Sequence, residues 1–201
     1  MILTKIDLLR HGEASGGRYY RGSTDDLLTP AGWLDMRKAV MGLETWDLIV
    51  SSPLRRCFNF AERMASDLDI PLQIEPAIKE YHFGEWEGQF ADDIEERWPG
   101  ALDHFYRDPD QFPPPKGEVF TDFKHRVVTA WQQLTAQHQG KHLLIITHAG
   151  VIRVLFQELL DLPPSSAYRI KIDHACLSRF QISHLEDQHY VQLIAHGQRQ
   201  N

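Results

Sequence analysis

Residues 6–13 read IDLLRHGE, an apolar run that stops abruptly at an arginine, a histidine and a glycine. The run from Ile6 to Leu9 is typical of a buried β-strand. Arg10 and His11 follow directly, and neither side chain belongs in an apolar core unless a partner satisfies it. The segment therefore predicts a strand that places these two side chains together at its end. Their partners must come from other parts of the sequence.

Apolar runs and helical patterns alternate along the chain after this first strand. Further strands are predicted over 46–51, 71–75, 142–147, 175–183 and 190–195. Helical spacing of apolar residues begins at Thr29-Pro30, Ser52-Pro53, Phe120 and Ala149; the first two starts pair a capping side chain with a proline. The alternation predicts a single three-layer α/β/α domain over residues 1–201, with a mostly parallel central sheet and the 142–147 strand near its centre.

The segment 80–116 breaks this alternation. It is rich in aromatic residues and contains three successive prolines at 113–115. One short helix is predicted near 91–97, and the remainder reads as irregular chain. An irregular insertion of this length is often a lid or a binding loop, so we expect residues from about 86 to about 116 to form one. Most of its aromatic side chains are expected to pack together, with one or two lining a pocket.

The composition argues against several classes of protein. The 201 residues carry a formal net charge of −7, which is unlike the basic excess of nucleic-acid-binding proteins. No apolar run approaches the roughly 20 residues of a membrane-spanning helix, and the N-terminal sequence does not resemble a signal peptide. The two cysteines, Cys57 and Cys176, form no disulfide framework, which fits a reducing compartment. We therefore expect a cytoplasmic protein that binds neither nucleic acid nor membrane.

Metal or cofactor binding is not expected either. The 11 histidines lack a neighbouring cluster of acids or thiolates at the spacing of metal ligands. The sequence carries no signal for the oligomeric state.

Polar side chains also follow two other predicted strands. Arg55 and Arg56 come just after the 46–51 strand, and His148 comes just after the 142–147 strand. In an open α/β sheet, ligands bind in the crevice at the carboxyl ends of the strands. Together with the pair after the first strand, these side chains gather positive charge at one edge. The natural partner is an anion, and the planar fork of an arginine suits phosphate.

Two predicted helices start at the same edge, one near Ser52-Pro53 and the other at His148-Ala149-Gly150. Free backbone N–H groups and the positive end of the helix dipole favour an anion at such starts. Gly12 and Gly150 lack a side chain and are expected to leave room for an approaching oxyanion.

These groups fit phosphoryl transfer through a histidine. A neutral imidazole is a competent nucleophile toward phosphorus, and nearby arginines should lower the pKa of His11 so that it stays unprotonated. The arginines and His148 can then stabilise the charge on the transferring group, as cations in place of a metal ion. The leaving alkoxide needs a proton, for which Glu80, Glu85 and Glu87 are all candidates on spacing alone.

Several stretches together resemble one known family. They are LLRHGE at 8–13, SSPLRRC at 51–57, EYHFGEWEG at 80–88, THAGVIR at 147–153 and GSTDDLLTPAG at 22–32. In this order they resemble the histidine phosphatase superfamily, also called phosphoglycerate mutase-like, over roughly residues 2–160. The resemblance implies an α/β fold and an activity that needs no metal.

The same resemblance implies roles for the matching residues. His11 resembles the phosphorylated nucleophile, and Arg10 and His148 resemble the pair that binds phosphate, next to Ala149 at the start of its helix. Arg56 matches the catalytic arginine, whereas Arg55 fills a variable position and is expected to be a surface residue. Glu80 matches the acid that protonates the leaving group.

The sequence departs from the family pattern at two points. Many members carry Trp-Asn shortly after RHGE, with the asparagine on phosphate, but Gly16-Gly17 stands there in this chain. Arg18 and Arg21 are nearby substitutes for the missing contact. Phe60 replaces the threonine that is usual in the helix of the second motif.

The short length favours a phosphatase over a mutase, whose chains tend to be longer. The stretches GGRYYRGSTDD and FGEWEG are similar to those of α-ribazole phosphatases, which suggests a small phosphorylated metabolite, such as α-ribazole 5′-phosphate, as the substrate. Two alternatives stay open. One is a mutase that returns the phosphoryl group to a substrate, and the other is a phosphate-binding module without turnover.

Overall fold

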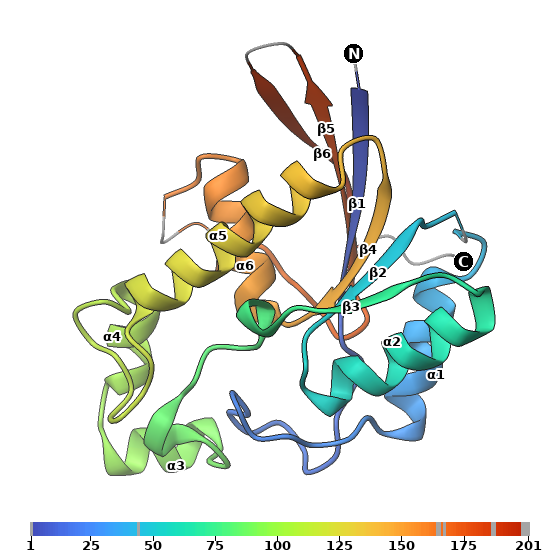
Figure 1. Ribbon diagram of the computed structural model, residues 1–201. Helices are drawn as coiled ribbons and strands as arrows, with labels where there is room; N and C mark the ends of the chain where they lie inside the picture. The colour runs from blue at the N-terminus through green and yellow to red at the C-terminus, as the bar shows by residue number, and fades with distance from the viewer. Residues whose placement is uncertain (1, 44, 164–165, 167, 186–187, 198–201) are drawn as a thin grey trace.

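The computed structural model describes residues 2–43, 45–163, 166, 168–185 and 188–197. Within this part of the chain, six strands form one sheet in the order β3-β2-β4-β1-β5-β6 (Figure 1). The strands span Ile2–Arg10 (β1), Leu48–Ser51 (β2), Leu72–Ile74 (β3), His142–Thr147 (β4), Leu177–His184 (β5) and His189–His196 (β6).

The sheet is mostly parallel, as predicted. β4 lies between β1 and β2 and pairs with both in parallel, and β3 pairs with β2 in the same direction. β5 and β6 add an antiparallel edge beside β1. All but the first residue of β4 is buried, which explains its near-continuous apolar sequence. The carboxyl ends of β2, β4 and β1 therefore lie side by side.

Helices cover both faces of the sheet and complete the predicted three layers (Figure 1). Helices α1 (Pro30–Val40) and α2 (Arg55–Leu68) lie on one face, and α5 (Phe120–Gln137) and α6 (Ala149–Leu159) lie on the other. Each face has its own apolar cluster. Alternate residues of β1 serve the two faces, since Ile6 and Leu8 pack in one cluster and Leu9 in the other. The described helices include none long and apolar enough to cross a membrane.

Helices α5 and α6 begin at Phe120 and Ala149, as predicted. The predicted capping side chain is confirmed for α1 and wrong for α2. The Thr29 side chain accepts a hydrogen bond from the Gly32 N–H and caps α1, as predicted. Helix α2 begins at Arg55 with Leu54 at the N-cap position, so Ser52-Pro53 is not its cap. The Ser52 hydroxyl instead lies 2.7 Å from the His148 ring at the edge of the sheet.

The segment 80–116 is more regular than predicted. Helix α3 (Ala91–Arg97) coincides with the expected helix, but α4 (Ala101–Arg107) and the short 3-10 turn η2 (Gly84–Trp86) were missed; η1 (Pro76–Ile78) precedes the segment. The carboxylate of Glu95 accepts hydrogen bonds from the Gly100 and Leu102 N–H groups. The start of α4 is therefore capped from the preceding helix, and a local sequence pattern does not reveal such a cap.

Aromatic packing holds this segment against the α5–α6 face. Trp86 and Phe105 are buried in the cluster of that face. Tyr106 is 40% exposed and lines a cavity together with Phe105. The expectation that most of the aromatic side chains pack and a few line a pocket matches this arrangement.

Candidate active site

Three neighbouring strands deliver the predicted site residues to one edge of the sheet. Arg10 ends β1, and the N–H of His11 donates to the Thr147 carbonyl at the end of β4, at 3.0 Å. Ser52 follows β2, and its N–H donates to the Ile146 carbonyl of β4, also at 3.0 Å. The backbone hydrogen bonds thus continue past the strand ends and fix the residues that carry the polar side chains.

A cleft of about 250 Å³ opens at this edge. The predicted site residues that line it are Arg10, His11, Arg18, Arg21, Arg56, Glu80 and Ala149. His148 is absent from the described residues that line the cleft, although its neighbour Ala149 is present. Seven of the eight predicted residues therefore line the cleft, and His148 is buried behind it.

His11 is 4% exposed and is held in one tautomer. Its Nδ1 lies 2.7 Å from the Gly12 carbonyl oxygen. Because a carbonyl only accepts, Nδ1 carries a proton, which leaves the lone pair on Nε2. Burial and the charges of Arg56 and Arg10 lower the pKa of His11 well below 6.5. The ring is therefore neutral at pH 7 and has a free nucleophilic nitrogen.

The two arginines of the site are held by backbone carbonyls. Arg10 donates to the Ile172 carbonyl at 2.6 Å, and Arg56 donates to the Thr24 and Gly22 carbonyls at 2.7 and 2.8 Å. The Nε atom of each guanidinium is buried without a hydrogen-bond partner among the described residues. Burial lowers the pKa of Arg10 to about 10, so it stays charged at neutral pH. Buried N–H groups beside fixed positive charge are suited to an anion.

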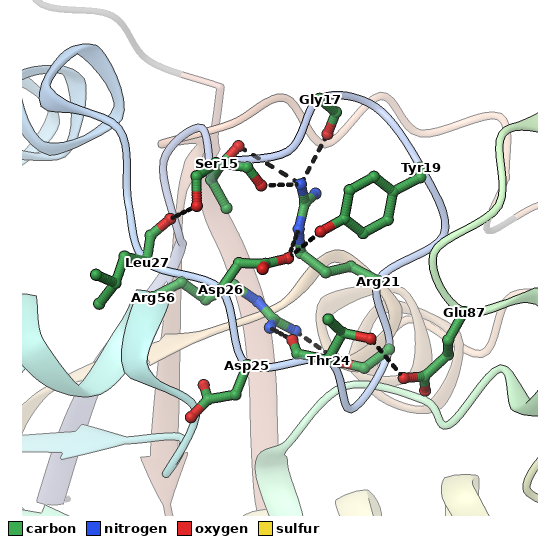
Figure 2. A network of polar contacts seen from close by, with 12 residues as sticks. Ser15, Gly17, Tyr19, Arg21, Thr24, Asp25, Asp26, Leu27, Arg56 and Glu87 are labelled. Atoms are coloured by element: carbon green, nitrogen blue, oxygen red, sulfur yellow. Dashed lines mark hydrogen bonds and ion pairs between the residues drawn. The ribbon is translucent and has the colours of Figure 1, made fainter.

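The loop that orients Arg56 is itself held by a polar network (Figure 2). Arg21 pairs with Asp26 at 2.9 Å and donates to the Ser15 and Gly17 carbonyls, each at 2.7 Å. The guanidinium of Arg21 is thus occupied within the loop, which favours a structural role for it.

A second carboxylate holds the same loop from the 80–88 segment. One oxygen of Glu87 accepts from the Thr24 hydroxyl at 2.8 Å (Figure 2). The other accepts from the Ser23 N–H, also at 2.8 Å. Arg18, in contrast to Arg21, is exposed at the cleft and makes no hydrogen bond to Asp26 or Glu87 in the described part of the chain. The guanidinium of Arg18 is thus available at the cleft, and its role as a substitute for the missing asparagine stays a prediction.

His148 is fully buried behind His11. The centroids of the two rings lie 5.2 Å apart, and His148 Nε2 lies 2.7 Å from the Ser52 hydroxyl oxygen. Burial, Arg56 and His11 lower the pKa of His148 well below 6.5. The ring is close to His11, as the sequence predicts, but its direct contact with a phosphate stays a prediction.

Glu80 is the acid that reaches the cleft. Its carboxylate accepts from its neighbour Tyr81 N–H at 3.0 Å and from the Gly150 N–H at 3.2 Å. Arg126 of α5 donates to the carbonyls of Lys79 and Glu80 at 2.8 and 3.1 Å and so fixes this segment.

The other two acids of the motif are engaged elsewhere. Glu85 pairs with Lys116 at 2.8 Å, and Glu87 binds the 22–24 loop. Neither lines the cleft in the described part of the chain. The structure therefore distinguishes three carboxylates that spacing left equivalent.

The two glycines have a different use from the one predicted. A Cβ atom on Gly12 would lie 2.1 Å from the Gly32 carbonyl oxygen, and one on Gly150 would lie 2.2 Å from Glu80 Oε1. Both positions admit protein atoms at close range, namely the start of α1 and the Glu80 carboxylate. These glycines were expected to make room for a ligand oxygen. In the structure they make room for protein atoms instead.

Two further residues were missed as candidates. The centroid of the His174 ring lies 5.8 Å from that of His11, and burial together with Arg10 lowers its pKa to about 4. No pattern in the sequence around His174 indicates this position. Arg153 lines the cleft, and its spacing from Ala149 on one helix face could have identified it. The described residues include no group of three or more His, Cys, Asp or Glu that could hold a metal ion.

Comparison with known proteins places this site in a family. The profile of the histidine phosphatase superfamily (branch 1) matches residues 6–194. The chain belongs to the histidine phosphatase superfamily. The resemblance of the sequence motifs to this superfamily is thus confirmed, and the match covers the three strand ends that build the site.

Individual relatives of this histidine phosphatase superfamily chain differ in length. Bifunctional protein Rv2228c of Mycobacterium tuberculosis is 31% identical over 180 residues, which are 87% of this chain and 49% of the relative. The chain thus spans about half the length of that relative. Adenosylcobalamin/alpha-ribazole phosphatase of Escherichia coli is 27% identical over 184 residues, which are 89% of this chain and 90% of the relative.

A solved structure of a putative alpha-ribazole-5'-P phosphatase from Escherichia coli has a TM-score of 0.83 at 26% identity. The match covers 98% of this chain and 97% of that one. The mixed α/β architecture is therefore that of other histidine phosphatase superfamily proteins.

Proposed function

We propose that the protein is a phosphoric monoester hydrolase that acts through a phosphohistidine on His11 and needs no metal ion. One observation carries the proposal. His11 is buried and neutral with Nε2 unprotonated, and it lines a cleft together with Arg10, Arg56 and Glu80. A nucleophile, two fixed cations and a carboxyl group are the parts that phosphoryl transfer requires.

The first step forms the covalent intermediate. Nε2 of His11 attacks phosphorus, a P–N bond forms, and the P–O bond to the alcohol breaks. Glu80, in its protonated form, gives its proton to the departing alkoxide. Arg10 and Arg56 stabilise the charge on the equatorial oxygens, because their buried N–H groups need no reorganisation when that charge develops.

The second step releases phosphate. The Glu80 carboxylate takes a proton from a water molecule, and the resulting hydroxide attacks phosphorus in line with the P–N bond. That bond breaks, His11 regains its lone pair, and inorganic phosphate leaves. The Ala149 N–H, at the start of α6, adds positive potential at the cleft, and the neutral ring of His148 lies beside His11.

The substrate is proposed to be a small phosphorylated metabolite. α-Ribazole 5′-phosphate belongs in the test panel because the Escherichia coli relative is named for it. The proposal also retains a cytoplasmic location, which the two unpaired cysteines, Cys57 and Cys176, support.

The test is hydrolysis of a generic aryl phosphate with a chelator present. Wild type should release phosphate and form an acid-labile phosphoenzyme, and His11→Ala should lose both, with its fold checked by circular dichroism. Arg55→Gln is the matched control, because Arg55 neighbours Arg56 but is exposed and pairs with Asp25 at 3.2 Å. Full activity of His11→Ala would refute the assignment of the nucleophile.

Two outcomes would point to the alternatives. Isomer formed from a phosphoglycerate without free phosphate would indicate a mutase, because the same groups serve either acceptor. Binding of phosphate analogues without any phosphoenzyme would indicate a module without turnover.

A further inference from the structure

A second cavity adjoins the cleft on the side of Glu80. It encloses about 90 Å³ and is lined mainly by aromatic side chains, among them Phe105, Tyr106 and Tyr168. Glu80 and Arg153 line both the cleft and this cavity, whereas Arg10 and Arg56 line the cleft only. Because Glu80 is the proposed proton donor to the leaving alcohol, the second cavity lies where the alcohol part of a substrate would extend.

Arg153 makes no ion pair with any residue that the structure describes, although Glu80 lines the same two spaces. Its Nε is buried without a hydrogen-bond partner, and its guanidinium carbon lies 5.4 Å from the centroid of the Tyr168 ring. Two other partly buried arginines differ in this respect, since Arg126 pairs with Glu118 and Arg179 pairs with Asp7. Within the described residues Arg153 makes no such pair. Its buried N–H and its positive charge can therefore bind an anionic group of a ligand.

The helix places this cation at a fixed point. Arg153 lies one turn beyond Ala149 and Gly150, which are at the start of α6. Ala149 lines the cleft, and the Gly150 N–H donates to the Glu80 carboxylate. Arg153 is thus rigidly placed on the same helix face as the groups that contact the cleft and the acid.

The size and lining of the cavity limit what Arg153 can bind. A volume of about 90 Å³ equals the share of about three water molecules in the liquid, at roughly 30 Å³ each. A carboxylate on a short carbon chain fits this space, and the arginine fork binds a carboxylate through two parallel hydrogen bonds. The aromatic walls add a low-dielectric surround in which such a pair is strengthened.

We propose that Arg153 binds a carboxylate on the alcohol part of the substrate, so that the protein selects small phosphate monoesters that carry a second, acidic group. This inference rests on the proposed function, since it takes the cleft as the phosphoryl site. It favours acidic esters over esters with a neutral alcohol, such as the nucleoside of α-ribazole 5′-phosphate.

The test compares two substrates of matched length, 3-phosphoglycerate and glycerol 3-phosphate, which differ by a carboxylate against a hydroxymethyl group. Wild type should show a kcat/KM for 3-phosphoglycerate that is higher by at least about tenfold, the usual worth of a hydrogen-bonded charge pair. Arg153→Gln should remove most of this preference, and Arg153→Lys should restore part of it. Arg63→Gln, an exposed arginine of α2, should leave the ratio unchanged.

Two results would contradict the inference about Arg153. No preference in wild type would overturn the inference. An equal loss for both substrates in Arg153→Gln, with weaker inhibition by inorganic phosphate, would also overturn it, because Arg153 would then bind the transferring phosphoryl group.

Calorimetric binding of both compounds to His11→Ala separates the inference from the proposed function. If the wild-type protein hydrolyses neither compound but 3-phosphoglycerate still binds more tightly through Arg153, only the proposed function is wrong. If neither compound binds in preference to the other, the inference about Arg153 is wrong whatever the activity.

Discussion

The chemistry of His11 follows from two neighbours that act on different atoms. The Gly12 carbonyl holds the proton on Nδ1, and burial with the charges of Arg56 and Arg10 keeps a second proton off the ring. A lowered pKa means that the neutral form persists to a lower pH than in a free histidine. The ring is therefore ready to attack throughout the neutral range.

This origin of the pKa can be tested at Arg56. In wild type, the His11 ring followed by NMR should titrate well below its ordinary pKa of 6.5. Arg56→Gln removes the charge that opposes protonation most strongly, so the midpoint should move upward toward 6.5. Arg55→Gln, with its exposed side chain, should leave it in place. A wild-type midpoint at the ordinary value would contradict the account.

The sequence identified Arg10, His11, Arg56 and His148 as neighbours because each directly follows a predicted strand. It could not choose between Glu80, Glu85 and Glu87 by spacing, because tertiary contacts distinguish them. Arg126 fixes the backbone at Glu80, whereas Lys116 engages Glu85. Arg21 was misleading for the same reason, since its partner Asp26 is only five residues away and captures the guanidinium.

Helix α6 controls the position of the acid through its first turn. The Gly150 N–H donates to the Glu80 carboxylate, and the absence of a side chain lets the two approach closely. Gly150 does not have a positive φ, so alanine suits its backbone and raises the helix propensity by about 1 kcal/mol.

Gly150→Ala therefore tests the role of Glu80 without touching its carboxyl group. The added Cβ would lie 2.2 Å from Glu80 Oε1 and must displace the carboxylate. We expect kcat to fall by about 100-fold or more, as when a general acid is removed, while the melting temperature changes little. In a Glu80→Gln background, Gly150→Ala should have little further effect. Additive losses in the double variant would show that the substitution acts elsewhere.

The regular elements were predictable because their apolar periodicity and caps are local. Helix α1 and strand β4 illustrate this, with a Thr29-Pro30 start and a buried six-residue run. Helix α4 escaped prediction because its cap comes from Glu95 on α3. The predicted cap of α2, Ser52, lies before the helix and contacts both the Leu54 N–H and the His148 ring. The misses thus occur where contacts between elements replace local signals.

One buried carboxylate on β1 forms hydrogen bonds to three other segments of the chain. Asp7 of β1 accepts from Arg179 of β5 at 2.7 and 2.8 Å, from Trp46 at 2.9 Å and from His142 of β4 at 3.0 Å. Burial raises the pKa of Asp7, but these hydrogen bonds outweigh it and lower the pKa to about 2. Four segments distant in the sequence depend on this one charge.

Stability should therefore fall in acid. A carboxyl group with a lowered folded-state pKa stabilises the protein fully above the unfolded value of 3.8 and loses that contribution as the pH falls toward 2. Asp7→Asn should lower the free energy of unfolding by about 2–3 kcal/mol at neutral pH, measured with urea. The difference in free energy of unfolding between Asp7→Asn and wild type should become smaller as the pH falls from about 4 to about 2. A constant gap across this range would exclude the proposed titration.

The assembly of the site from β1, β2 and β4 has a practical consequence. An exposed turn at Gln139-Gly140 separates the part of the chain that carries His11, Arg56 and Glu80 from the part that carries His148 and Arg153. Two complementary fragments divided at this turn would each hold an incomplete set of groups. If the two fragments were coexpressed as fusions to two interacting proteins, hydrolysis of a phosphate ester would report that the two proteins had bound each other.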